Sequence, residues 1–218
     1  MATDETRPRI IEAAGPIFAE RGFEKATVRE ICDAAGVGVA SINYHFRDKQ
    51  HLYVLVVEHA YEHLHCSRLP RLDDVPEGPP IERLREWILR LTRKVITARD
   101  ESWQDRLFAR EVQSPTAACE DFLRERIRSD LKPLREVLDA VLPPQTTEAD
   151  RWRVVHSVLG QVLFYDTYRR FIRIIQNDGD APLTLDAEQL ADHVTRFCTA
   201  ALGMAPPLSE TYVGKTND

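Results

Sequence analysis

Apolar residues recur at intervals of three and four positions along most of the chain, which is the spacing of one face of an α-helix. The first stretch carries Ile10, Ala14, Ile17 and Phe18 at this spacing, and Gly22 supplies a helix end. No segment shows the alternation that is typical of a half-buried strand. The pattern therefore predicts an all-α fold.

Two short helices are expected in the rest of the first 50 residues. Thr27 and Glu30 have the spacing of a capping box, which predicts a helix that begins at Val28 and stops at Gly36. A second short helix follows the turn, and its buried face would consist of Val39, Ile42 and Phe46. Short helices joined by a glycine-containing turn are typical of a helix-turn-helix.

Proline and glycine clusters divide the remainder into longer helices. Residues 70–80 (PRLDDVPEGPP) form the clearest break, because they are rich in residues that stop helices. Between such breaks, periodic stretches predict helices at residues 48–64, 81–99, 102–112, 114–142, 148–176 and 186–202. Pro133 is expected to kink or interrupt the fourth of these.

Composition narrows the function classes. Hydrophobic residues make up 43% and charged residues 29% of the 218 residues, as in an ordinary folded protein. No apolar run approaches the roughly 20 residues of a membrane span, and the polar N-terminus lacks the features of a secretion signal, so we expect a cytoplasmic protein. The net charge of −6 argues against a general nucleic-acid coating protein but leaves specific DNA binding open.

The second short helix carries polar groups on its outward side. Ser41, Asn43, Tyr44 and His45 alternate with the apolar positions that hold this helix against the others. Such groups suit the recognition helix of a DNA-binding motif. The pattern alone is also compatible with a small helical hairpin whose outer face is simply solvated.

The stretch FAERGFEKATVREICDAAGVGVASINYHFRDKQHLY closely resembles the N-terminal domain of the tetracycline-repressor (TetR) family. The segments LFAREVQSPTAA, HSVLGQVLFY and LDAEQLADHVTRFCTAALGM look like the C-terminal domain of its CecR-like subgroup. The resemblance implies a DNA-binding domain at residues 1–50 and a helical effector-binding and dimerisation domain at residues 51–218. It further implies a homodimeric regulator, mostly repressive in this family, which binds a palindromic operator and responds to a small organic effector.

The resemblance also implies roles for individual side chains. Thr27 would cap the second helix and contact a phosphate, and Arg29 would contact a phosphate or a guanine edge. Tyr44 and His45 would contact the DNA backbone, and Lys49 would neutralise a phosphate. Such contacts set the register of a protein on DNA without selecting its sequence.

Asn43 departs from the family pattern, because the position before Tyr44 is frequently tyrosine in relatives. An asparagine can pair with adenine through two hydrogen bonds, so we expect Asn43 to contact a base. Ser41 completes the predicted set of DNA contacts. The recognition helix begins with small residues, which indicates that the shape of the DNA contributes to the choice of operator.

The last two predicted helices are apolar enough to form a dimer interface. Val158 and Phe197 belong to stripes that would pair with their symmetry mates in a four-helix bundle, although an intramolecular core would explain the same stripes. An effector site needs apolar walls and a few polar groups. The candidates for it are Trp87, Trp103, Phe108, Arg110, Glu111, Gln161, Phe164, Tyr165 and Arg169.

Three other functions were weighed. We find no constellation of activated groups for catalysis and expect no enzymatic activity and no cofactor. His59 and His63 have the i, i+4 spacing of metal ligands and lie near Cys66, so a metal-responsive regulator is the main alternative. A polar helix end without metal is the favoured explanation of these residues, because no further ligand is identifiable. A protein-interaction scaffold that does not bind DNA is the third class.

Overall fold

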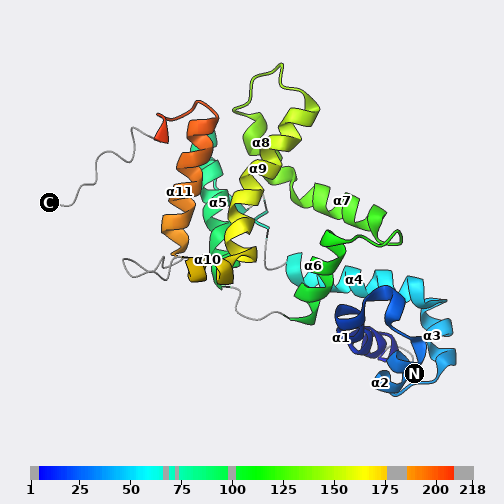
Figure 1. The fold of residues 1–218 in the computed structure, drawn as a ribbon. Helices are drawn as coiled ribbons and strands as arrows, with labels where there is room; N and C mark the ends of the chain where they lie inside the picture. Colours follow the sequence, from blue (N-terminus) through cyan, green and yellow to red (C-terminus); the bar gives the residue numbers. More distant parts are fainter. Residues whose placement is uncertain (1–4, 66–68, 72–73, 98–101, 176–185, 209–218) are drawn as a thin grey trace. The chain divides into compact units, whose positions relative to one another are not determined.

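The computed structural model describes residues 5–65, 69–71, 74–97, 102–175 and 186–208. Every regular element within these ranges is helical, which confirms the predicted fold class (Figure 1). No helix among the described residues is both long enough and apolar enough to cross a membrane. The helices are α1 (Thr6–Lys25), α2 (Val28–Ala35), α3 (Val39–Phe46), α4 (Lys49–His65), α5 (Pro80–Thr97), α6 (Trp103–Gln113), α7 (Glu120–Asp130), α8 (Lys132–Asp139), α9 (Glu148–Thr167), α10 (Arg169–Ile175) and α11 (Ala187–Ala201).

The chain packs as two compact units. The first consists of residues 1–67 and 100–128, and the second of residues 68–99 and 129–218. Helix α5 belongs to the second unit, whereas α6, which follows it in the sequence, belongs to the first. There α6 packs against both α1 and α4. These compact units do not test the predicted division into a DNA-binding domain at residues 1–50 and an effector-binding and dimerisation domain at residues 51–218, which stays a prediction.

Local capping explains the short helices α2 and α3. The Thr27 hydroxyl accepts a hydrogen bond from the Glu30 N–H at 3.2 Å, and the Glu30 carboxylate accepts one from the Thr27 N–H at 3.1 Å. This is the predicted capping box. Gly36 ends α2 in the left-handed region, with φ 62° and ψ 41°, where a glycine is favoured. The predicted end of α1 at Gly22 is instead a kink, with φ 73°, inside a helix that continues to Lys25.

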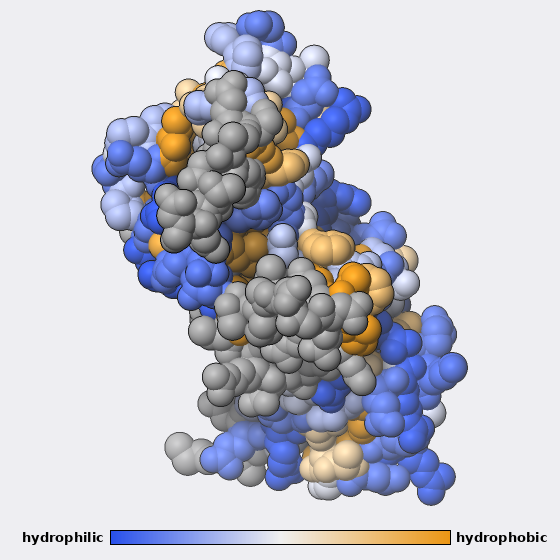
Figure 2. Space-filling view, turned by 60° about the vertical axis from the view of Figure 1, so that its left-hand side comes forward, coloured by the Kyte–Doolittle hydropathy of each residue, from blue (hydrophilic) through white to orange (hydrophobic). Residues whose placement is uncertain are grey.

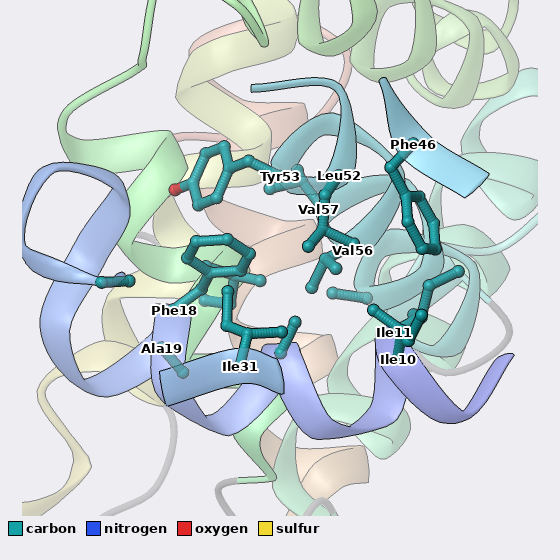
Figure 3. Packing of buried hydrophobic residues seen from close by; sticks show 14 of the residues in the cluster. Ile10, Ile11, Phe18, Ala19, Ile31, Phe46, Leu52, Tyr53, Val56 and Val57 are labelled. Carbon is teal, nitrogen blue, oxygen red and sulfur yellow. The ribbon is translucent and has the colours of Figure 1, made fainter. Parts of the chain in front are cut away.

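Large apolar side chains fill the centre of the first unit (Figure 3). The rings of Phe18 and Tyr53 meet edge to face with their centroids 4.8 Å apart. Ile31 from α2 and Phe46 from α3 are fully buried in the same cluster. The helix-turn-helix is thus held by residues of α1 and α4, because α2 and α3 are too short to be stable alone.

Helix α6 lies close to α1 at two glycines. A Cβ atom at Gly15 would come within 2.4 Å of the Trp103 ring, and one at Gly22 within 2.6 Å of the Arg110 guanidinium. The two glycines are seven residues apart, as are the two side chains that cover them. The equal spacing indicates that α6 follows α1 in the same direction, in a register set by these close approaches.

A buried carboxylate joins α6 to α4. Glu111 is only 1% exposed, and one of its oxygens accepts a hydrogen bond from the Tyr53 hydroxyl at 2.5 Å. The other oxygen accepts from the backbone N–H and the hydroxyl of Thr116 at 3.1 and 3.2 Å. Burial and the neighbouring carboxylate raise the pKa of Tyr53 well above its usual value, so its hydroxyl remains a donor.

The second unit is a helical bundle in which α11 packs on α5, and α5 also contacts α8 and α9. Trp87, an effector candidate, is fully buried here, and its indole N–H donates to the Pro70 carbonyl at 3.3 Å. Arg85 of α5 forms an exposed ion pair with Asp192 of α11 at 2.7 Å.

Two of the predicted long helices are divided. The stretch 114–142 forms α7 and α8, with Pro133 in the first turn of α8, where its missing N–H leaves no hydrogen bond unmade. The stretch 148–176 forms α9 and α10, which are separated at Tyr168. Backbone hydrogen bonds from Tyr168 to Phe164 and from Ile172 to Tyr168 continue across that separation.

The close approach of α6 to α1 predicts that Gly15→Ala destabilises the protein. The added methyl group would displace the Trp103 ring at a cost of about 1–3 kcal/mol, as in overpacked cores. Urea denaturation followed by circular dichroism measures this change. In a Trp103→Leu background the same substitution should be neutral or stabilising, because alanine is the better helix former. An equal cost in both backgrounds would show that Trp103 is not the obstacle.

Candidate nucleic-acid interface

Helix α3 has an exposed polar face and an opposite apolar face that is buried in the first unit. Ile42 and Phe46 are fully buried against the rest of the first unit. Asn43 is exposed, Tyr44 is 76% exposed, and Ser41 and His45 are partly exposed. The rings of Tyr44 and His45 pack edge to face at 4.9 Å. These four side chains are therefore available on one short, well-supported helix.

One residue of α3 differs from the sequence expectation. Val39, which we expected on the buried face, is 51% exposed. It is the first residue of α3 and follows the N-cap Gly38, so it lies one turn before the first buried position, Ile42. The anchoring of α3 rests on Ile42 and Phe46.

The start of α2 places charged groups beside α3. The Thr27 hydroxyl donates to the Glu30 carboxylate at 2.9 Å, in addition to accepting the capping bond. The hydrogen bonds from Thr27 lower the pKa of Glu30, assisted by the cation of Arg21, with which Glu30 forms an ion pair. Arg29 is exposed on the same helix and is available to a ligand in solution.

Lys49 lies at the first position of α4, and its ammonium group faces backbone carbonyl groups. It donates to the carbonyl oxygens of Phe23 at 2.8 Å, Ala26 at 3.1 Å and Glu24 at 3.5 Å. The preceding Asp48 caps α4 by accepting from the His51 N–H at 2.7 Å. Lys49 and Asp48 thus define where α4 begins.

The effector candidates of the first unit occupy α6. The Trp103 ring stacks on His59 of α4 with centroids 6.0 Å apart, and Phe108 contacts Tyr61 of the same helix at 5.3 Å. Glu111 is the buried acceptor of Tyr53 and Thr116 described above. Arg110 is exposed and covers Gly22.

The remaining effector candidates belong to the second unit. The Gln161 amide donates to the Cys198 sulfur at 3.6 Å, which joins α9 to α11. Phe164 is half exposed and contacts the rings of Tyr165 and Tyr168 at 6.0 and 4.9 Å. Arg169 begins α10, and its side chain lies outside the described part of the chain. The candidates therefore divide between the two units, and their convergence on one effector stays a prediction.

His59 and His63 of α4 have protein partners. His59 Nε2 is 2.9 Å from a carboxylate oxygen of Glu12, and His63 Nδ1 is 3.0 Å from the His59 carbonyl oxygen. Cys66 lies outside the described residues. Within the ranges that the structure describes, no group of three or more His, Cys, Asp or Glu residues is arranged to hold a metal. The metal-responsive alternative thus gains no support.

Exposed apolar side chains gather on the last helices of the second unit. On the face shown in Figure 2, apolar groups lie among a mainly hydrophilic surface. The exposed members on α9, at the α9–α10 separation, and on α10 and α11 are Phe164, Tyr168, Phe171, Ile174, Ile175 and Phe197. Val158, which we assigned to the same stripe, is only 2% exposed and belongs to the core of its own unit. Val158 thus fits the intramolecular core, whereas an interface at the exposed residues stays a prediction.

Sequence reasoning did not find the pairing of Tyr53 with Glu111, which are 58 positions apart. No local pattern indicates this contact, because each residue occupies an unremarkable helical position. Lys49 was singled out, but its contact with the Phe23 carbonyl joins residues 26 positions apart. Such contacts depend on how the helices pack and require the fold.

Comparison with known proteins identifies the two halves of the chain. Residues 10–56 match the model of the bacterial regulatory proteins of the tetR family. Residues 80–202 match the C-terminal domain of the HTH-type transcriptional dual regulator CecR. The CecR protein of Shigella flexneri is 29% identical over 175 residues, which are 74% of this chain and 76% of that protein. The probable regulator YttP of Bacillus subtilis is 24% identical and covers 82% of this chain and 98% of its own length.

Solved structures agree on the fold. A putative fatty acid metabolism regulator of Clostridium perfringens is 23% identical with a TM-score of 0.56, over 90% of this chain and 98% of its own. AibR, in complex with isovaleryl coenzyme A and operator DNA, is 22% identical with a TM-score of 0.56, over 88% and 97%. With its helix-turn-helix and both matching domains, the chain belongs to the TetR family of DNA-binding transcription regulators, in the subgroup with a CecR-type C-terminal domain.

Proposed function

We propose that this regulator is a homodimeric repressor that binds a palindromic operator and changes its affinity when a small organic effector binds. The observation that carries the proposal is the exposed polar face of α3 behind which Ile42 and Phe46 are fully buried. A helix held in this way keeps its side chains in one arrangement as it enters the major groove.

On DNA, each side chain of this face takes a role set by its chemistry. Asn43 pairs with the N6 and N7 positions of an adenine, while Tyr44 and His45 contact phosphates and hold the register. Ser41 lies one turn from His45 and contacts the same groove. Arg29, at the exposed start of α2, contacts a phosphate, and Thr27 orients that start through its cap.

The dimer forms through α9, α10 and α11. Their exposed apolar residues would leave water when two copies pair about a twofold axis, and apolar burial is the main driving force of such association. The twofold axis would place two α3 helices about 34–36 Å apart, one turn of DNA.

The effector is proposed to be a small organic molecule. AibR carries an acyl coenzyme A according to its description, which makes thioesters of short acids a reasonable first class to test here. An effector that prefers the DNA-free arrangement would weaken operator binding by about 5- to 150-fold, the usual range of allosteric coupling. The candidate contacts are Trp103, Phe108, Arg110, Glu111, Gln161, Phe164, Tyr165 and Arg169.

The DNA contacts predict different effects for Asn43 and Arg29. Asn43→Ala should remove discrimination at one position of the operator, which corresponds to about 1–3 kcal/mol for the lost bidentate pair. Arg29→Ala should weaken binding to all sequences and reduce the salt slope by about one. Both are measured on duplexes that the parent protein selects from a random pool. Parental affinity and sequence preference in both variants would contradict the docking.

The proposed interface predicts that Phe197→Glu converts the dimer to a monomer. The carboxylate would be buried without a partner on association, at a cost of several kcal/mol, whereas the folded monomer leaves Phe197 43% exposed. Sedimentation measures the oligomeric state. Val112→Glu, at an equally exposed apolar position on α6, is the control and should remain a dimer. An intact Phe197→Glu dimer would move the interface elsewhere.

The proposed effector site predicts that Tyr165→Ala loses the effector response but keeps operator affinity. Isovaleryl coenzyme A and related acyl thioesters are the first probes, with release of labelled operator as the measurement. His156→Ala, at an exposed position of the same helix, is the control and should respond normally. A normal response of Tyr165→Ala to a compound that releases the parent protein would contradict the assignment of the site.

A further inference from the structure

The ammonium group of Lys49 occupies the C-terminal end of α1. Its distances to the carbonyl oxygens of Phe23, Ala26 and Glu24 are 2.8, 3.1 and 3.5 Å, and it also lies 4.4 Å from the centre of the Phe23 ring. A lysine ammonium has three N–H donors and no acceptor. Each donor therefore has a carbonyl oxygen in the protein itself.

Phe23 and Glu24 belong to the last turn of α1, and Ala26 is its C-cap residue. The last carbonyls of a helix have no partner within it, and they form the negative end of the helix dipole. A cation at this place satisfies them and is favoured by the dipole. The aromatic face of Phe23 attracts the same charge, and Phe23 itself packs on Tyr53 in the core, with ring centroids 5.1 Å apart.

The position of this contact in the chain gives it a wider effect. Ala26 is followed directly by Thr27, the cap of α2, and Lys49 follows α3 after only Arg47 and Asp48. Arg47 adopts φ 67° in this turn, and the connection between α3 and α4 has only two residues. The turn therefore leaves the two helices little freedom to move apart. A single side chain thus connects the segment that enters the helix-turn-helix to the segment that leaves it.

We propose that Lys49 is a positioning residue that caps α1 and holds both ends of the helix-turn-helix, and that it is not a phosphate ligand. A phosphate could take its ammonium only by displacing a carbonyl that would then lack a donor. This assignment revises the role that the family resemblance implies for Lys49. Its statement about phosphate rests on the proposed DNA binding, whereas its statement about the cap of α1 does not.

The test compares Lys49→Met and Lys49→Arg with Arg29→Ala in the full-length protein. Binding to a duplex of arbitrary sequence and to a selected operator is measured across a series of salt concentrations. We expect Lys49→Met to keep the parental salt slope, because no phosphate contact is lost, and to lose about 10-fold or more in operator affinity. Arg29→Ala should lower the slope by about one and serves as the positive control. Lys49→Arg, which retains donors and charge, should recover part of the operator affinity.

Thermal unfolding provides a readout that does not depend on DNA. Lys49→Met should lower the Tm by about 3–6 °C, as expected for a protein of this size that loses a charged cap. When Phe23→Leu is combined with Lys49→Met, the loss of Tm should be smaller than the sum of the two single losses, because each substitution alone already removes the contact between the ammonium group and the Phe23 ring. If the parent protein binds no duplex, the proposed function fails. The thermal unfolding of Lys49→Met then still tests whether Lys49 caps α1.

Two results overturn the assignment. A salt slope that falls by about one in Lys49→Met would establish a phosphate contact, whatever its Tm. A Tm equal to that of the parent would show that the carbonyl contacts do not hold the helix end.

Discussion

The carboxylate of Glu111 is the constraint on which the first unit depends. A buried charge is costly unless it is fully hydrogen-bonded, and Glu111 receives its donors from Tyr53 of α4 and from Thr116 after α6. The requirement can be met only when α4, α6 and the turn that precedes α7 are all in place. Apolar packing would tolerate small shifts between these helices, whereas this set of hydrogen bonds specifies one arrangement.

The glycine contacts extend this arrangement to α1. Trp103 covers Gly15, and Arg110 covers Gly22. Helix α6 therefore packs closely on α1 as well as on α4. The helix-turn-helix is then fixed to the same body through the cap at Lys49 and the buried Ile31 and Phe46. Because α6 packs on both helices, a displacement of α6 would move α1 and α4 together.

The sequence predicted the helical class, the capping box at Thr27 and the short helix α3 after Gly36, because these depend on local spacing and short-range hydrogen bonds. It also anticipated the interruption of the stretch 114–142 at Pro133, but it did not find the separation of α9 and α10 at Tyr168, where apolar periodicity continues across the turn. It assigned Val158 and Phe197 alike to apolar stripes of a dimer interface, although only Phe197 is exposed. Burial depends on which helix lies opposite, and the Lys49 and Glu111 contacts likewise join residues that are distant in sequence.

The first unit is interrupted in the sequence, since α5 is made between α4 and α6 and belongs to the other unit. During translation, α1 to α4 therefore leave the ribosome before the helix that covers them exists. At about 5–20 residues per second, several seconds pass before α6 is complete. During that interval Trp103 does not yet cover Gly15 of α1, and the Tyr53 hydroxyl lacks the Glu111 carboxylate as its hydrogen-bond acceptor. The nascent segment α1 to α4 therefore exposes this surface of α1 until α6 has been made.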